Sequence, residues 1–275
     1  MNVIPAQGYD PTFLGPTIAF PELRINAQAD AYQVSNSPYI HYMHFSLTLS
    51  TSKQFAYWAA WNIDGSHLNK NVKRTGKSFR KDKRIPREYQ AGAELYSDNI
   101  LDRGHLARHE DLLWGNDDEA EQASYDSFFY TNITPQAKGF NQSGKKGVWG
   151  QLENAALEVS KNKRMSCFAG PIFQSRDRVY ERQRKFQIPS KFFKILAYQN
   201  ESKLTTKAFI LVQNLDRLAI SPLDKFKTFE HSISEIESFR LLTFPTILKD
   251  TQKLSRRLSL LATNEPIRSV NEIDW

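Results

Sequence analysis

Short apolar segments rich in aromatic and β-branched residues recur along the chain and limit the fold classes that it can adopt. Such segments between polar stretches are typical of β-strands, and they occupy residues 42–49, 55–63, 99–107, 128–133, 166–173, 192–198 and 208–212. At residues 149–161 the apolar positions recur every three or four residues, which predicts a helix with one apolar face. Further helices are expected near residues 116–124 and 233–241. These elements predict an α+β fold in a single domain, with a central antiparallel sheet flanked by helices.

Composition indicates where this domain begins and ends. Residues 1–38 are rich in Pro, Asn, Gln and Gly, so we expect an irregular N-terminal arm draped over the domain. The predicted domain spans residues 39–250, and the polar residues 251–275 form a C-terminal tail. No apolar run approaches the ~18 residues that a membrane-spanning helix needs, and the N-terminus lacks the pattern of a signal peptide. We therefore expect no membrane partner and a cytoplasmic location, or export by a leaderless route.

The net charge of +7 points to a polyanionic partner, either nucleic acid or an anionic membrane surface. Nine Lys or Arg residues lie between residues 69 and 87, which we interpret as a cationic surface loop. Cys167 is the only cysteine, so an internal disulfide and a cysteine-based zinc site are both excluded. It lies in a predicted buried strand and is interpreted as a core thiol.

The tetrapeptide at residues 102–105 carries the first chemical signal. Asp102, Arg103, Gly104 and His105 place an acid, a fixed cation and an imidazole side by side. Phosphodiester hydrolysis needs a base for water and a cation for the phosphate, and in a strand Arg103 and His105 share a face. A chance combination on a surface turn remains an equal alternative for the tetrapeptide alone.

Downstream segments resemble a known family. Residues 130–136 read YTNITPQ, residues 140–142 read FNQ and residues 149–153 read WGQLE. Together with DRGH at 102–105, and in this order, they resemble the DNA/RNA non-specific endonuclease family, the ββα-metal nucleases. Weaker similarity at residues 79–82, 168–173 and 188–194 extends the resemblance to roughly residues 40–245. It implies a ββα-metal motif within the predicted domain.

The resemblance also implies roles for individual residues. His105 is similar to the general base that activates water, Asn141 to the direct metal ligand, and Glu153 to the carboxylate that holds metal-bound waters. Arg103 and Arg80 resemble phosphate-binding arginines. The resemblance gives orienting roles to Asn132, Gln136 and Asp102, with Gln136 also near the substrate and Asp102 also open to interpretation as a plain turn residue. The implied cofactor is Mg²⁺, which usually keeps several waters; Mn²⁺ or another divalent cation could substitute.

One segment departs from the compact spacing of the family. Residues 142–148 read QSGKKGV and lengthen the chain between Asn141 and Trp149. Gly144 and Gly147 flank Lys145 and Lys146, which suggests a flexible basic bulge before the helix. Two interpretations stay open: a longer loop without a role, or a contact of both lysines with nucleic acid.

The resemblance implies a non-specific endonuclease that cuts both DNA and RNA. Its cleavage should depend little on base sequence, because phosphates and a metal are recognised rather than base edges. Its base must be neutral, so activity should fail below a pH near 6.5 if the histidine pKa is unperturbed. Two alternatives remain: a non-catalytic nucleic-acid-binding protein of the same fold, and a phosphodiesterase for small substrates. A nuclease without a leader endangers its own cell, so a defence enzyme or effector toxin with an inhibitor, activator or immunity protein is a plausible setting. The oligomeric state is not predicted.

Overall fold

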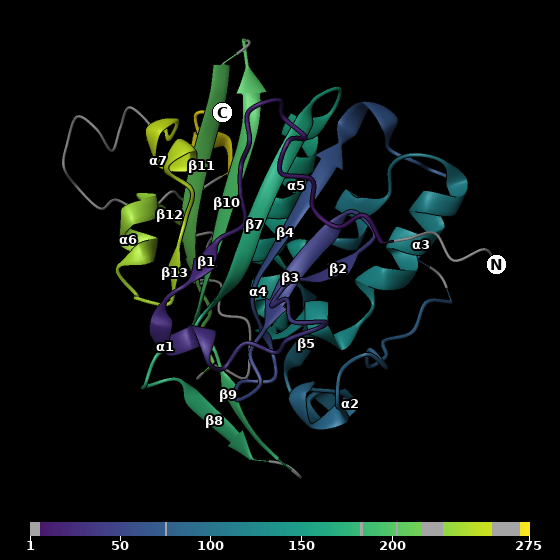
Figure 1. Cartoon of the computed structure of the whole chain (residues 1–275), viewed down its shortest axis with the longest axis vertical. Helices are drawn as coiled ribbons and strands as arrows, with labels where there is room; N and C mark the ends of the chain where they lie inside the picture. The colour runs from purple at the N-terminus through teal and green to yellow at the C-terminus, as the bar shows by residue number, and fades with distance from the viewer. Residues whose placement is uncertain (1–5, 75, 182–183, 202, 216–227, 255–269) are drawn as a thin grey trace.

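The computed structural model describes residues 6–254 and 270–275, except for residues 75, 182–183, 202 and 216–227. A seven-stranded sheet crosses the molecule, with the strand order β12-β11-β10-β7-β4-β3-β2 and every neighbouring pair antiparallel (Figure 1). Its strands are β2 (Ile40–Tyr42), β3 (Phe45–Leu49), β4 (Ala56–Asp64), β7 (Arg164–Ile172), β10 (Lys191–Asn200), β11 (Lys203–Val212) and β12 (Thr228–Glu230). The predicted α+β class and central antiparallel sheet are confirmed.

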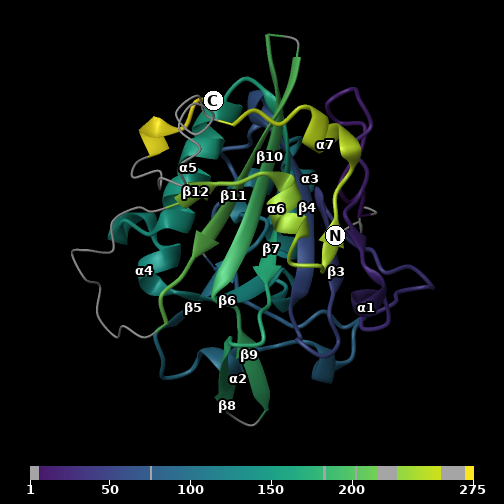
Figure 2. The same ribbon diagram turned by 90° about the vertical axis from the view of Figure 1, so that its left-hand side faces the viewer.

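Each face of the sheet carries its own hydrophobic cluster. On one face, α5 (Val148–Ser160) packs Trp149 and Leu152 against the strands, with α4 (Lys138–Asn141) beside it. On the other face, α6 (Ile233–Glu237) and α7 (Thr246–Asp250) pack together with the N-terminal segment, whose Tyr9 is buried there. Figure 2 shows these two pairs of helices on opposite sides of the sheet. The sheet is therefore buried on both faces, which explains its nearly continuous apolar strands.

A separate two-stranded unit lies on the α5 side and carries the DRGH segment. Strand β5 (Leu101–His105) pairs with β6 (Ile133–Ala137), and α3 (Asp117–Ser127) connects them. A capping box between Asn116 and Glu119 fixes the start of α3, because each side chain bonds the other residue's backbone N–H. After β6 the chain enters α4 and then α5, so two strands and a helix follow one another as the ββα arrangement requires.

The remaining elements are short. They are β1 (Glu22–Leu23), α1 (Ile25–Gln28), α2 (Ala93–Tyr96), β8 (Arg178–Glu181), β9 (Lys185–Ile188) and β13 (Leu242–Thr243). Short 3₁₀ helices occur at η1 (Gly65–His67), η2 (Arg87–Tyr89), η3 (His109–Leu112), η4 (Tyr130–Asn132), η5 (Ser143–Lys145) and η6 (Val270–Glu272). Within the described residues, no helix has the length and apolar character needed to cross a membrane.

Three local expectations need correction. The single strand expected at residues 42–49 is the hairpin β2–β3, because His44 takes a positive φ of 67° and turns the chain. The strand expected at residues 128–133 is mostly the 3₁₀ helix η4, and the pairing strand β6 begins only at Ile133. The tail is not wholly a loose polar segment, since Ile273 is buried in the core and Trp275 packs beside it.

Candidate active site

A groove of about 500 Å³ opens where β5, α4 and the first turns of α5 converge. Its lining includes five residues that the sequence singled out: Asp102, Arg103, His105, Asn141 and Glu153. These residues are as many as 51 positions apart in the chain, and the β5–β6 hairpin followed by α4 and α5 brings them together. The groove is therefore the candidate active site.

His105 ends strand β5 and is almost completely buried, with 8% of its surface exposed. The rings of Phe79 and Phe128 lie 5.7 and 5.3 Å from the imidazole. Its Nε2 is buried and has no hydrogen-bond partner among the described residues. Burial lowers the pKa of His105 to about 3, and the nearby positive charges of Arg74 and His109 act in the same direction. The imidazole is consequently neutral at physiological pH, with a free nitrogen available to take a proton.

Asp102 orients Asn141 across the groove. The Asn141 amide nitrogen donates to Asp102 Oδ2 at 3.1 Å, and Gln142 Nε2 donates to the same oxygen at 2.6 Å. Because the side-chain amide nitrogen of Asn141 is held in this way, the side-chain oxygen Oδ1 is the atom left to bind a cation. This contact favours the orienting role of Asp102 over that of a plain turn carboxylate.

Glu153 lies on the groove wall and is 7% exposed. Its Oε1 accepts a hydrogen bond from the buried Lys194 at 3.0 Å. Asp111 lies nearby in the interior, where burial and, to a smaller extent, the negative charge of Glu153 raise its pKa to about 7. Asp111 Oδ2 accepts a bond from Trp61 Nε1 at 3.1 Å.

Arginines supply the positive charge of the groove. The Arg103 guanidinium lies between the rings of Phe79 and Tyr96, at 5.4 and 5.3 Å, and its Nε donates to Tyr130 Oη at 3.3 Å. Stacking between two rings holds a planar guanidinium in place while its remaining N–H groups stay available for phosphate.

Besides the two lysines of the bulge, three residues predicted for the site do not line the groove. Arg80 instead bonds the carbonyls of Ser78 and Tyr125 and stacks 3.3 Å above the Tyr125 ring, so its guanidinium is committed elsewhere. Asn132 is fully buried, and its amide bonds only backbone groups. Gln136 is fully buried behind Gly104, where a Cβ would collide with the Gln136 side chain.

The bulge reaches the edge of the groove. Ser143 and Gly144 belong to the lining, whereas Lys145 and Lys146 follow them as exposed residues outside it. Lys146 adopts a positive φ of 60° before the chain enters α5. The two lysines therefore lie beside the site.

The structure adds groove residues that sequence reasoning did not select. Arg74, Arg108, His109 and Glu110 all line it. Glu110 links the others, since its carboxylate lies 3.0 Å from Arg108 Nε, 3.6 Å from His109 Nδ1 and 3.8 Å from Arg74 Nη1. The basic loop at residues 69–87 was the available signal for Arg74. For the other three the signal was position, because they directly follow the DRGH strand.

The donor atoms of the groove fit a hydrated divalent cation. Among the residues that the structure describes, no group of three or more His, Cys, Asp or Glu side chains could hold a metal ion. A cation here would take few ligands from the protein and keep most of its waters, as Mg²⁺ usually does. The amide oxygen of Asn141 and the carboxylate of Glu153 are hard oxygen donors of the kind that Mg²⁺ prefers.

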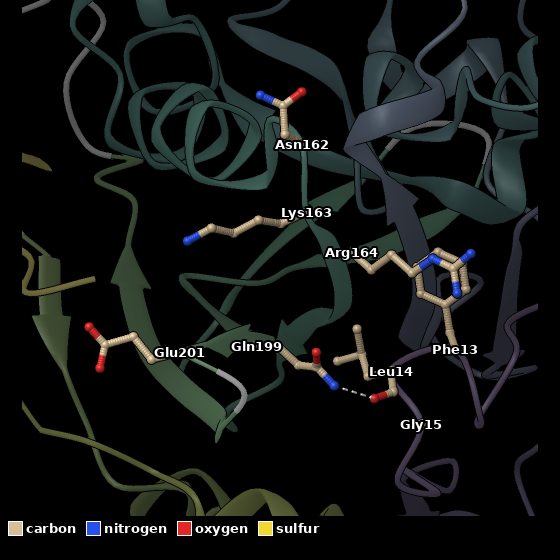
Figure 3. A pocket seen from close by; sticks show the side chains of 8 residues that line it. All are labelled: Phe13, Leu14, Gly15, Asn162, Lys163, Arg164, Gln199 and Glu201. Atoms are coloured by element: carbon tan, nitrogen blue, oxygen red, sulfur yellow. Dashed lines mark hydrogen bonds between the residues drawn. The ribbon is translucent and has the colours of Figure 1, made fainter.

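A second cavity of about 470 Å³ has a different character (Figure 3). Gln199 Nε2 donates to the Leu14 carbonyl at 2.8 Å, and Arg164 stacks 4.9 Å from the Phe13 ring while its Nε pairs with Asp64. These side chains attach the N-terminal segment to the sheet. Its lining contains no histidine, so we assign it no catalytic role.

The chain is similar in sequence to known nucleases. The family model described as DNA/RNA non-specific endonuclease matches residues 26–251. An uncharacterized protein of Sinorhizobium fredii is 34% identical over 89% of this chain and 38% of its own length. A nuclease of Nostoc is 33% identical over 46% of this chain and 43% of its own, and bovine mitochondrial endonuclease G is 24% identical over 70% and 64%. The chain thus spans less than two thirds of the length of these relatives.

A solved structure shares the fold. The EndoG/EndoGI complex, solved to explain the mechanism of EndoG inhibition, matches with a TM-score of 0.58 at 16% identity, covering 74% of this chain and 84% of that one. At this identity the likeness shows the fold alone, whereas the family model covers most of the sequence. The chain belongs to the DNA/RNA non-specific endonuclease family.

Proposed function

We propose that the protein is a metal-dependent endonuclease that hydrolyses phosphodiester bonds in DNA and RNA with little regard for base sequence. One observation carries the proposal: the His105 imidazole, which burial keeps neutral, lines the same groove as the oxygen donors of Asn141 and Glu153. A neutral imidazole beside a cation site is the combination that hydrolysis by an activated water requires.

The residues divide the work as follows. The His105 imidazole takes the proton from the attacking water. Asn141, oriented by Asp102, would hold Mg²⁺ directly, and Glu153 would hold it through waters. When bound, the cation supplies electrostatic stabilisation for the phosphate and the leaving oxygen. Arg103 meets the charge that develops on the phosphate, and Arg74, on the groove wall, is placed to assist it.

The geometry favours a polymer over the two alternatives. A non-catalytic binding protein would not need a base and a cation site in one groove. A small-substrate phosphodiesterase would want a closed pocket with more metal-ligating carboxylates, whereas here exposed lysines of the bulge extend the cationic surface past the groove. Recognition through phosphates explains why neither base nor sugar identity should matter much.

A plasmid-nicking assay tests the proposal. His105→Ala should lower the rate by about 10²-fold or more, the usual effect of losing a general base. Asn141→Ala should raise the Mg²⁺ concentration needed for cleavage, and EDTA should abolish cleavage until Mg²⁺ or Mn²⁺ is restored. His67→Ala is the matched control, since His67 is exposed and lies outside the groove. Cleavage that survives EDTA, or a His105→Ala variant with normal turnover, contradicts the proposal.

We also propose a protein inhibitor as a partner. The solved relative is held in a complex that inhibits it, and an unrestrained nuclease would damage the nucleic acid of its own cell. Affinity capture with the His105→Ala variant, followed by an activity assay with the captured protein, tests this. The cytoplasmic or leaderless-export location remains a proposal that fractionation of expressing cells would check.

A further inference from the structure

Lys194 occupies an unusual place for a lysine. It lies in strand β10 near the middle of the sheet and is 1% exposed, on the face covered by α5. Its neighbours in register on the next two strands are Ala169 and then Ala59, small residues that leave room for a long side chain. Burying an ammonium costs several kcal/mol unless it is well paired, so its contacts should explain its presence.

The ammonium of Lys194 has one ionic partner among the described residues, and that partner is Glu153. Nζ lies 3.0 Å from Glu153 Oε1. Two ring faces also lie near it: Nζ lies 4.0 Å from the centre of the Trp149 ring and 5.4 Å from that of Trp61. The buried Asp111, which bonds Trp61, interacts with the ammonium electrostatically from farther away. These ring faces stabilise the cation without competing for the carboxylate. The position of the ammonium is therefore fixed from three sides.

This contact leaves Glu153 half engaged. Oε1 is held from the interior, whereas Oε2 has no hydrogen-bond partner among the described residues, and the residue lines the groove. A carboxylate held at one oxygen by a fixed cation cannot rotate freely, so its second oxygen keeps a defined place. Interactions behind a metal site commonly orient its ligands in this way.

We propose that Lys194 is a positioning residue that holds Glu153 in the orientation needed to bind the waters of the catalytic cation. This inference rests on the proposed function, in which Glu153 contacts those waters. A purely structural role is the competing explanation. Buried ion pairs are weak contributors to stability, and apolar residues of similar volume often replace them without loss.

The same sheet supplies a matched control. Lys207 on β11 pairs with Glu230 on β12 at the same 3.0 Å distance and is equally buried, at 1% exposure, but neither residue lines the groove. Lys207→Met should therefore reproduce the loss of a buried ion pair without touching the metal site. An effect on Mn²⁺ binding that Lys194→Met shows and Lys207→Met does not show comes from the displaced Glu153 carboxylate rather than from a general loss of stability.

The test measures Mn²⁺ binding to the full chain in a His105→Ala background with an uncleaved DNA duplex, by electron paramagnetic resonance of free Mn²⁺. Glu153→Gln and Lys194→Met should each weaken Mn²⁺ binding by about 10-fold or more, the usual effect of losing an outer-shell partner. Lys207→Met should leave it unchanged. The double variant Glu153→Gln/Lys194→Met should bind no more weakly than Glu153→Gln, because Lys194 acts through Glu153.

Each contrary result has a distinct meaning. A folded Lys194→Met variant with normal Mn²⁺ affinity, beside a weakened Glu153→Gln variant, overturns the positioning role and leaves the proposed function intact. Normal affinity in Glu153→Gln itself removes Glu153 from the metal site and overturns both. If Lys194→Met does not fold, the double variant, which leaves no unpaired buried charge, replaces it: a further loss of Mn²⁺ affinity relative to Glu153→Gln overturns the inference.

Discussion

At the scale of single residues, burial prepares His105 for its proposed role. Exclusion from water lowers its pKa to about 3, so the base stays neutral through the physiological range. The sequence-based limit near pH 6.5 assumed an unperturbed histidine and therefore does not apply to the free protein. We expect no acid limb from this group near pH 6.5.

The same shift should appear in stability. The unfolded chain takes up a proton at His105 below a pH of about 6.5, whereas the folded protein does not until about pH 3. Falling pH therefore favours the unfolded state, and this group should remove about 2 kcal/mol of unfolding free energy between pH 7 and pH 5. The His105→Ala variant has no histidine to titrate at this position. Urea titrations in EDTA should therefore show that the difference in unfolding free energy between wild type and variant falls by about 2 kcal/mol from pH 7 to pH 5. A constant gap would mean that the histidine titrates normally.

Asn132 belongs to the scaffold around the base, and its effect should be on folding. Its amide accepts a bond from Ala107 N at 2.9 Å and donates to the carbonyls of Ala107 and Ser127 at 2.9 and 3.1 Å. At about 1 kcal/mol for each bond, Asn132→Ala should destabilise the fold by about 3 kcal/mol. Asn141→Ala, at a partly exposed position, should cost less than about 1 kcal/mol. Chemical denaturation of both variants checks the contrast, and equal losses would contradict it.

At the scale of elements, the contact between α4 and α5 sets the place of the metal ligand. A Cβ at Gly150 would lie 2.5 Å from the backbone carbonyl oxygen of Asn141 and 2.7 Å from the backbone nitrogen of Ser143, so the backbone must move to admit it. Alanine ordinarily favours a helix over glycine by about 1 kcal/mol, but here the collision should dominate and displace Asn141. Gly150→Ala should thus weaken Mn²⁺ binding several-fold. Gly144→Ala, where an added Cβ meets nothing within 4 Å, should not; equal affinities in the two variants would refute the argument.

The elements also show how far sequence could lead. Periodicity located α5, and apolar runs located β4, β7 and β10, because these elements bury regular faces against one another. The turn at His44 was not predicted, because a positive φ in a non-glycine residue does not change the pattern of apolar residues. For the site, the order of the sequence motifs correctly indicated that His105 and Asn141 lie close together, since both line one groove. It misplaced Arg80, because stacking on Tyr125 depends on tertiary contacts that spacing does not reveal.

At the scale of the whole molecule, the net charge of +7 gives little information until its distribution is known. Exposed cationic residues flank the groove on two sides, in the loop that carries Arg74 and in the bulge with Lys145 and Lys146. A nucleic acid strand in the groove would meet both segments. Its phosphates would be neutralised by side chains that make no contact with the reacting bond.

Salt dependence tests whether the bulge belongs to the binding surface. Each neutralised phosphate contributes a log–log slope of about −0.9 to duplex affinity, because counterions are released. If both lysines contact phosphates, Lys145→Ala/Lys146→Ala should flatten the slope by about 1.8, twice that value, and weaken two unrelated duplexes alike. Lys161→Ala/Lys163→Ala removes the same charge from the far end of α5, beside the cavity of Figure 3, and should leave the slope near that of wild type.

Salt titrations in the inactive His105→Ala background measure the slopes, and mapping of cleavage sites by sequencing in the active protein measures sequence preference. Equal slopes for the two double variants would remove the bulge from the binding surface, and a strong motif preference that persists at high salt would contradict recognition through phosphates alone.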